Sequence, residues 1–350
     1  MAENRLTSSD KRELLLWVLL GIVGAVFAYK YFFRAFPEAS VDFKVSRSEA
    51  LERAQKFVGG LGEDITGYQP AIVFDLDDNA KTYLEREVGL QQANQLMSSK
   101  LNIWYWNVRF FRAGQEEEFH VRVSPAGNIV GYEHTIQEAR AGATLDRAAA
   151  ETAAQGFLRS KMSVDLSKWD FLSEEANSSE RPSRLDWSFT WEEHGFKAKD
   201  APYRLRVTLQ GDRAGSSEEF LQVPEAWQRS YTHLRSTNIF YNQVAIIPYL
   251  LLMGSALWLG IQLTKSGQTS WGPALKLGIV VAILLFFMQL NNWPLDRMGY
   301  DTNSTYGTFV FGEIAKALLF GLLSALTVVL PIPGAEPLYR SAQPGRLRLT

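Results

Sequence analysis

The chain contains no cysteine, which excludes several kinds of chemistry at once. Without thiols it forms no disulfide, has no thiolate nucleophile and holds no cysteine-based zinc or iron–sulfur site. Histidine is scarce too, and none of the four residues belongs to an HExxH motif or to another close pair with metal-ligand spacing. These four are His120, His134, His194 and His233. We therefore expect no cofactor in this chain.

An excess of one charge is also missing. The 36 lysines and arginines are balanced by 38 aspartates and glutamates, which leaves a net charge of -2. The basic residues are dispersed along the sequence and are not gathered into a stripe. Because nucleic-acid binding needs such a basic surface, we do not expect nucleic acid as a partner.

What the chain does contain is four long apolar runs. They lie at residues 14–34, 239–263, 271–293 and 309–330. Each run is long enough to cross a hydrocarbon layer of about 30 Å at about 1.5 Å per residue. A cleaved signal peptide is the alternative for the first run, but this run is long and rich in aromatic residues, and no small-x-small cleavage site follows it. We predict a retained anchor, four membrane spans and membrane lipids as partners.

Lysine and arginine near the span ends predict the orientation, because basic loops stay in the cytoplasm. Lysine or arginine residues lie in the tail at residues 1–13, in the connection between the second and third spans and in the end at residues 331–350. Alternating crossings place these three on one side. The loop at residues 291–308 has Arg297 as its single basic residue against two aspartates, so it belongs on the other side. We predict that both termini are cytoplasmic and that residues 36–236 are extracytoplasmic.

Polar residues at the edges of the spans are the candidate sites in the membrane part. Glu313 and Lys316 are three residues apart, so they can pair on one helical face. Near the outer end of the last span, an interfacial pair is favoured over a proton or substrate site. Asn291, Asn292 and Trp293 form an interfacial cap in the same way, with the indole at headgroup depth.

Small residues recur at intervals of four in the first and last spans. Gly21 and Gly24 each precede an alanine at this interval, and the last span contains Ala317, Gly321 and Ala325. Such spacing lets helices approach closely, although small residues are also simply frequent in membrane helices. We therefore treat these faces as candidate packing surfaces.

The soluble region between the first two spans repeats itself. Apolar residues of the segment 45–57 fall on one helical face, and the segment 144–157 matches it at an offset of 100 residues. A capping residue, Ser46 or Asp146, precedes each predicted helix. The matched pairs are Arg47 with Arg147, Ala50 with Ala150, Ala54 with Ala154, and Phe57 with Phe157.

Predicted strands follow each helix. In the first copy Asn107 and Arg109 alternate with apolar residues, which indicates a strand with one buried face. The segment 119–131 matches 203–215 without a gap as strand, turn and strand. Glycines at the predicted repeat turns are Gly127, Gly131, Gly211 and Gly215. An insertion at residues 79–100 is predicted to be helical.

The predicted fold class is an α-helical membrane protein with four spans and a large inserted α+β region of two helix-plus-antiparallel-sheet repeats. The segments in order are a cytoplasmic tail at 1–13, a span at 14–34, repeat 1 at 36–140, repeat 2 at 141–236, spans at 239–263, 271–293 and 309–330, and a basic cytoplasmic connector at 331–350.

Glu117, Glu118 and Arg122 form an EExxxR pattern. This pattern is the signature of the CPBP-type intramembrane proteases, whose glutamates belong on a membrane helix, where they can activate water. Here the residues alternate on a soluble strand, which places the two glutamates on opposite faces. We therefore predict no catalytic residue in this chain.

Two copies of a helix with an antiparallel sheet resemble tandem PepSY-type domains. The anchor, this outer region and the spans that end in residues 325–350 together resemble the front part of a bacterial CPBP-family protease of the CAAX or bacteriocin-processing type. The resemblance implies the bacterial inner membrane and a peptidase whose catalytic glutamates, histidines and any metal follow Thr350. This chain would then be its non-catalytic portion, with modules that bind or regulate a peptide or protein substrate. The alternative is a complete, non-enzymatic PepSY-like sensor or binding protein.

Overall fold

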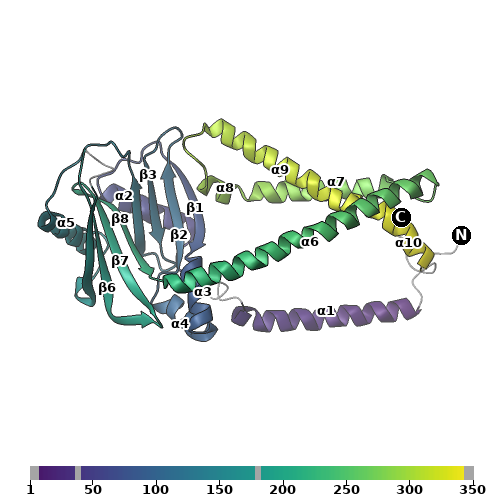
Figure 1. Cartoon of the computed structure of the whole chain (residues 1–350), viewed down its shortest axis with the longest axis horizontal. Coiled ribbons are helices and arrows are strands. Elements are labelled where there is room, and N and C mark those ends of the chain that lie inside the picture. The colour runs from purple at the N-terminus through teal and green to yellow at the C-terminus, as the bar shows by residue number, and fades with distance from the viewer. Residues whose placement is uncertain (1–7, 36–40, 178–182, 343–350) are drawn as a thin grey trace. The chain divides into compact units, whose positions relative to one another are not determined.

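The computed structural model describes residues 8–35, 41–177 and 183–342 of the chain (Figure 1). These residues divide into two units. An α/β unit comprises Val41–Leu234 and Asn292–Gly312, and a helical unit contains the remaining segments. The α/β unit is therefore built from two stretches of sequence, separated by two of the apolar helices.

One eight-stranded antiparallel sheet forms the centre of the α/β unit, with the strand order β1-β2-β3-β4-β8-β7-β6-β5. Its first half consists of β1 (Gln69–Leu76), β2 (Trp104–Phe111), β3 (Glu118–Val123) and β4 (Ile129–Thr135). Its second half consists of β5 (Trp169–Asn177), β6 (Asp186–Ala198), β7 (Ala201–Gln210) and β8 (Arg213–Leu221). The halves join through β4 and β8, so the predicted repeats share a continuous sheet.

One helix precedes each half. Helix α2 (Arg47–Gly60) begins with a capping box formed by Ser46 and Glu49, and α5 (Arg147–Ser160) is capped by Asp146. On both helices two alanines and one larger apolar residue are buried against the sheet: Ala50, Ala54 and Val58 on α2, and Ala150, Ala154 and Leu158 on α5. Both halves thus have one helix followed by four antiparallel strands. That they are copies of one PepSY-like module stays a prediction.

The segment predicted as a helical insertion forms two helices, α3 (Asp78–Glu87) and α4 (Leu90–Ser99). Tyr83, Leu84 and Met97 of these helices pack into one core with residues from the second half, among them Tyr203 and Leu221. A short 3-10 helix, η2 (Leu166–Lys168), precedes β5. The insertion therefore connects the two halves of the sheet at one end.

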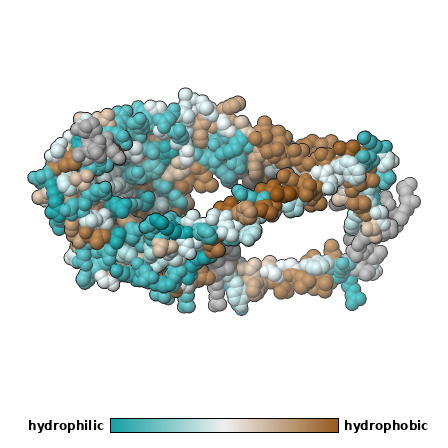
Figure 2. All heavy atoms as spheres, in the orientation of Figure 1, coloured by the Kyte–Doolittle hydropathy of each residue, from teal (hydrophilic) through white to brown (hydrophobic). Residues whose placement is uncertain are grey.

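Helices dominate the other unit. They are α1 (Ser8–Ala35), α6 (Glu225–Lys265), α7 (Gly272–Asn291), α9 (Tyr306–Val329) and α10 (Ile332–Ala342); α6 and α9 each begin in the α/β unit. Four helical segments are long and apolar enough to cross a membrane, at Lys11–Phe32, Glu225–Lys265, Gly272–Asn291 and Tyr306–Ala342. Figure 2 shows the hydrophobic surface concentrated on these helices. This is the pattern of a multi-pass membrane protein, as the apolar runs predicted.

Close helix packing occurs on the last span, as its small residues predicted. Ala317 and Gly321 are buried, and a Cβ placed on Gly321 would lie 2.6 Å from the carbonyl oxygen of Ala282 on α7. On α1, by contrast, a Cβ at Gly21 or Gly24 would meet no atom within 4 Å. Small-residue spacing therefore marks a packing face on α9.

The segment predicted as a connector, 331–350, contains helix α10 in its described part, after a break at Pro331. Gly127 and Gly211 are turn residues with φ of +94° and +69°, as predicted, but Gly131 and Gly215 lie within β4 and β8. A Cβ at either of these two would meet the side chain of a neighbouring strand residue, at 2.9 Å or less. They are glycines for that reason and not because of a turn.

Candidate functional site

Arg109 is the most highly connected charged residue of the sheet. It lies near the end of β2 and is only 6% exposed. Its Nε donates to a carboxylate oxygen of Glu118 at 2.9 Å, and its Nη1 donates to the carbonyls of Met298 and Tyr300 at 2.9 and 2.8 Å. The sequence predicted a strand with one buried face, but Arg109 and Phe111 are buried on the other face as well.

The carbonyls bound by Arg109 belong to the loop between α7 and α9, within the segment Asn292–Gly312 of the α/β unit. The first part of this segment is the short helix α8 (Trp293–Met298), which lies beside β1 (Figure 1). Tyr300 is 1% exposed and packs with Ala71 and Phe111 of the sheet. The main-chain N–H of Gly114 donates to the carbonyl of Thr302 at 2.8 Å. We call the contact of Arg109, Phe111 and Glu118 with Met298 and Tyr300 the sheet–loop junction.

The electrostatics of this junction favour an ionised Glu118. Burial raises the pKa of its carboxyl group, but hydrogen bonds from His120 and Arg109 outweigh burial and hold the pKa below the ordinary value. Glu118 and Arg109 therefore form a charged pair that is largely shielded from water. The two loop carbonyls accept hydrogen bonds from the Nη1 atom of the same guanidinium group. Removing either charge would leave the other one buried without its partner.

The two glutamates of the EExxxR pattern have different partners: Glu118 is the first residue of β3, and Glu117 directly precedes it. Glu118 pairs with Arg109, whereas Glu117 pairs with His134 at 2.9 Å and with Arg140 at 2.6 Å. Burial lowers the pKa of His134, which stacks on Phe119 with 4.2 Å between ring centroids. The two glutamates thus have separate arginine partners and do not form a shared site.

The predicted membrane-edge residues have simpler surroundings. Glu313 and Lys316 form the predicted ion pair near the start of α9. Asn291 ends α7, Asn292 accepts main-chain hydrogen bonds at the start of α8, and Trp293 packs on Phe309. The structure brings none of these residues into the sheet–loop junction.

A buried carboxylate on α10 was missed by the sequence interpretation. Glu336 is 7% exposed and pairs with Arg340 one turn later. The helix lies close to α6, since a Cβ on Gly334 would lie 3.0 Å from the carbonyl oxygen of Ala256. The i, i+4 spacing of a glutamate and an arginine was the available signal, but the region was expected to be a connector.

A cleft opens where the two halves of the sheet meet. The pairing of β4 with β8 covers residues 131–133 and 216–218, and beside it the side chain of Gln210 donates to the carbonyl of His134 at 2.9 Å. The cleft has a volume of about 840 Å³ and is bounded by β4, β7, β8 and the chain that follows β4. Asn303, from the segment that carries Tyr300, also lines it. We call this the junction cleft.

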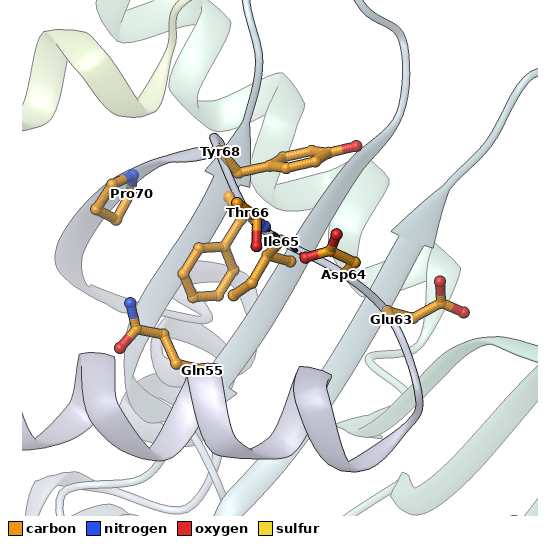
Figure 3. Close-up of a pocket in the computed structure, with 8 residues that line it drawn as sticks. Gln55, Glu63, Asp64, Ile65, Thr66, Tyr68 and Pro70 are labelled. Atoms are coloured by element: carbon orange, nitrogen blue, oxygen red, sulfur yellow. Dashed lines mark hydrogen bonds between the residues drawn. The ribbon is translucent and has the colours of Figure 1, made fainter.

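A second, smaller pocket lies beside the end of α2, and Figure 3 shows its lining. Its volume is about 330 Å³. Acidic groups of this pocket already have partners within the protein: Asp64 accepts a hydrogen bond from the N–H of Thr66, and Glu63 pairs with Arg213. The junction cleft is therefore the more promising binding site.

Within the part of the chain that the structure describes, no group of three or more histidines, aspartates or glutamates is placed to hold a metal ion. Comparisons with protein-family models, with curated proteins and with solved structures find no match to this chain. The site must be interpreted from its own geometry.

Proposed function

We propose that this chain is the non-catalytic portion of a CPBP-type intramembrane endopeptidase, in which an extracytoplasmic α/β domain binds substrate and regulates the membrane helices. One observation carries the regulatory part: Arg109 of the sheet binds the loop between α7 and α9. The two hydrogen bonds from Arg109, together with the packing of Tyr300 on Phe111, attach the loop to the sheet. The assignment to a peptidase rests on the resemblance of the sequence.

The sheet–loop junction also supports the proposed topology. If α7 and α9 cross the membrane, then the sheet must be on the same side as the loop that it contacts. The loop 291–308 has a single basic residue, Arg297, so this side is extracytoplasmic by the positive-inside rule. Both termini are then cytoplasmic.

Coupling between the domain and the membrane helices follows from this arrangement. A ligand that binds the domain more tightly when the loop is docked would stabilise the docked state. The loop would in turn raise the affinity for that ligand by the same factor. Arg109 is the residue through which the sheet holds the loop, and α7 and α9 are the helices whose ends the loop connects.

Labelling of an introduced thiol tests the regulatory role in lipid nanodiscs. The chain has no cysteine, so Thr302→Cys introduces a single thiol at a position that is only 8% exposed. We expect slow maleimide labelling in the otherwise unchanged protein and much faster labelling with Arg109→Gln. Arg206→Gln, on the same sheet face but paired with Glu218 instead of the loop, is the matched control. Equal labelling rates in all three proteins would exclude coupling through Arg109.

The peptidase assignment needs a separate experiment. In membranes from cells that express the natural gene, we expect cleavage of a membrane-anchored reporter peptide. Cleavage should fall with Arg109→Gln and stay unchanged with Arg206→Gln. Coupling without cleavage would favour the alternative function, a non-enzymatic PepSY-like sensor. The junction cleft supports the proposed function and this alternative equally, because a sensor also needs a binding site that reaches the loop.

A further inference from the structure

Acidic side chains around the junction cleft differ from those on the neighbouring strands. Glu118, Glu192 and Glu218 of the sheet are each paired with an arginine. Glu116, Glu133 and Glu138, which line the cleft, make no ion pair with another described residue. Thr208 and Ser216 add hydroxyl groups to the same lining. Arg184 also lines the cleft, but its guanidinium group is held by Asp186 and by three main-chain carbonyls of the chain that follows β4. The cleft thus offers exposed carboxylates whose charge no other described residue neutralises.

The spacing of these groups argues against a metal ion. Glu116 follows β2, Glu133 belongs to β4 and Glu138 to the chain beyond β4. No three acidic residues or histidines of the described chain converge closely enough to coordinate one ion. Carboxylates that are spread along a cleft are instead suited to several cationic groups spaced along one ligand.

The lining also restricts the type of cation. Phenylalanine, tyrosine and tryptophan are absent from the described residues that line the cleft, so it has no aromatic cage for a quaternary ammonium group. Carboxylates and hydroxyls accept hydrogen bonds, and a primary or secondary ammonium group donates them. A volume of about 840 Å³ is in the range of small-ligand sites.

From this geometry we propose that the junction cleft binds a linear ligand with several primary or secondary ammonium groups. Two sources share this chemistry: a free polyamine, and the lysine side chains of an extended peptide. Asn303 brings the loop into the same cleft, so the ligand would contact both halves of the sheet and the segment that Arg109 holds. The effect on the loop rests on the proposed function, whereas binding is measured separately.

Calorimetric titration of the full chain tests the site in phosphatidylcholine nanodiscs, whose lipids carry no net charge. The probes are spermine and a nine-residue extended peptide with alternate lysines, and the matched negatives are choline and the same peptide with acetylated lysines. We expect at least one cationic probe to bind and both negatives to fail. Glu133→Gln with Glu138→Gln should weaken binding about 10-fold or more, and 0.5 M salt should weaken it as well.

A control of equal charge shows whether the cleft is responsible. Glu52 and Glu175 are exposed and lie outside the cleft, so changing both to glutamine removes the same charge elsewhere. We expect this control to bind like the unchanged protein. Binding of spermine alone identifies a polyamine, and binding of the peptide alone identifies a protein segment. Failure of both probes, or equal loss in the two double variants, overturns the proposal.

Labelling of Thr302→Cys separates this inference from the proposed function. Slower labelling in the presence of the bound probe supports both. If the probe binds through Glu133 and Glu138 but labelling does not change, the cleft is a ligand site and the regulatory function is wrong. If Arg109→Gln speeds labelling but no probe binds, the regulatory function stands and the ligand assignment is wrong.

Discussion

The Nη1 atom of Arg109 donates a 2.8 Å hydrogen bond to the carbonyl of Tyr300, which lies 191 residues further along the chain. The Tyr300 ring, in turn, packs 5.3 Å from the ring of Phe111, two residues after Arg109. A hydrogen bond from a side chain to the main chain and a contact between two rings therefore join the same two segments. This double attachment makes the loop between α7 and α9 part of the sheet domain.

Replacing Arg109 with glutamine should release the loop. The change leaves Glu118 largely buried without its cation and removes two hydrogen bonds to loop carbonyls. We expect docking to weaken by about 3 kcal/mol, roughly a 100-fold change in the docking equilibrium. Hydrogen exchange of residues 293–306 in nanodiscs measures this change. Arg206→Gln, whose side chain is 43% exposed, should leave the exchange of this segment within about twofold.

Tyr300 should stabilise the docking of the loop on the sheet mainly through its ring. Tyr300→Ala empties a site among Phe111, Tyr306 and Phe309, and we expect a cost of about 3–5 kcal/mol in docking. Tyr300→Phe keeps the ring and loses the hydrogen bond from its hydroxyl to Ser304, which should cost about 1 kcal/mol. Hydrogen exchange of the loop distinguishes the two variants. Equal effects would mean that the hydroxyl, and not the ring, holds the segment.

The junction should weaken in acid. Burial raises the pKa of Glu118, yet hydrogen bonds from His120 and Arg109 lower it below the ordinary value of 4.5. Because the folded-state pKa is the lower one, this stabilisation is complete above the ordinary value and is lost as the pH falls through it toward the folded-state pKa. Exchange protection of the loop, corrected for intrinsic rates, should therefore drop in this acidic range. Glu118→Gln should remove this step, and a step that persisted would have to come from another carboxyl group.

Much of the helical architecture could be predicted because its cause is local. The last two apolar runs, at 271–293 and 309–330, coincide with α7 and α9 within three residues, since the length of an uninterrupted apolar run predicts the length of the helix. Capping residues likewise marked the starts of α2 and α5. Glycine spacing predicted the turn at Gly127, where φ is positive.

The candidate site could not be predicted in the same way. In the sequence Arg109 is the polar member of an alternating strand, so its face was expected to be exposed. The face is buried because a loop nearly two hundred residues away covers it, and no periodicity within β2 records that contact. The junction cleft depends on the pairing of β4 with β8, which likewise joins distant segments. Of this site, only the composition of the loop 291–308, with its single basic residue, could be read from the sequence.

Packing of α7 against α9 should depend on Gly321. A Cβ at this position would lie 2.6 Å from the carbonyl oxygen of Ala282, which is backbone and cannot rotate away. Gly321→Val should therefore separate the helices and cost about 1–3 kcal/mol. Gly254→Val on α6 is the control, because its Cβ would meet nothing within 4 Å. Thermal aggregation in a mild detergent measures the difference, and equal midpoints for the two variants would contradict close packing at Gly321.

Two glycine-to-alanine substitutions in the second half of the sheet domain should change its stability in opposite directions. Gly211 has φ +69°, and a Cβ there would lie 2.8 Å from the main-chain nitrogen of Ala143, so Gly211→Ala should destabilise the domain by more than about 1 kcal/mol. Gly156 lies in α5 with no atom within 4 Å of a Cβ, so Gly156→Ala should stabilise it by about 0.5–1 kcal/mol. Urea unfolding followed by tryptophan fluorescence reports both, because β6 carries Trp187 and Trp191. A stabilising Gly211→Ala would mean that the turn between β7 and β8 does not adopt this left-handed conformation.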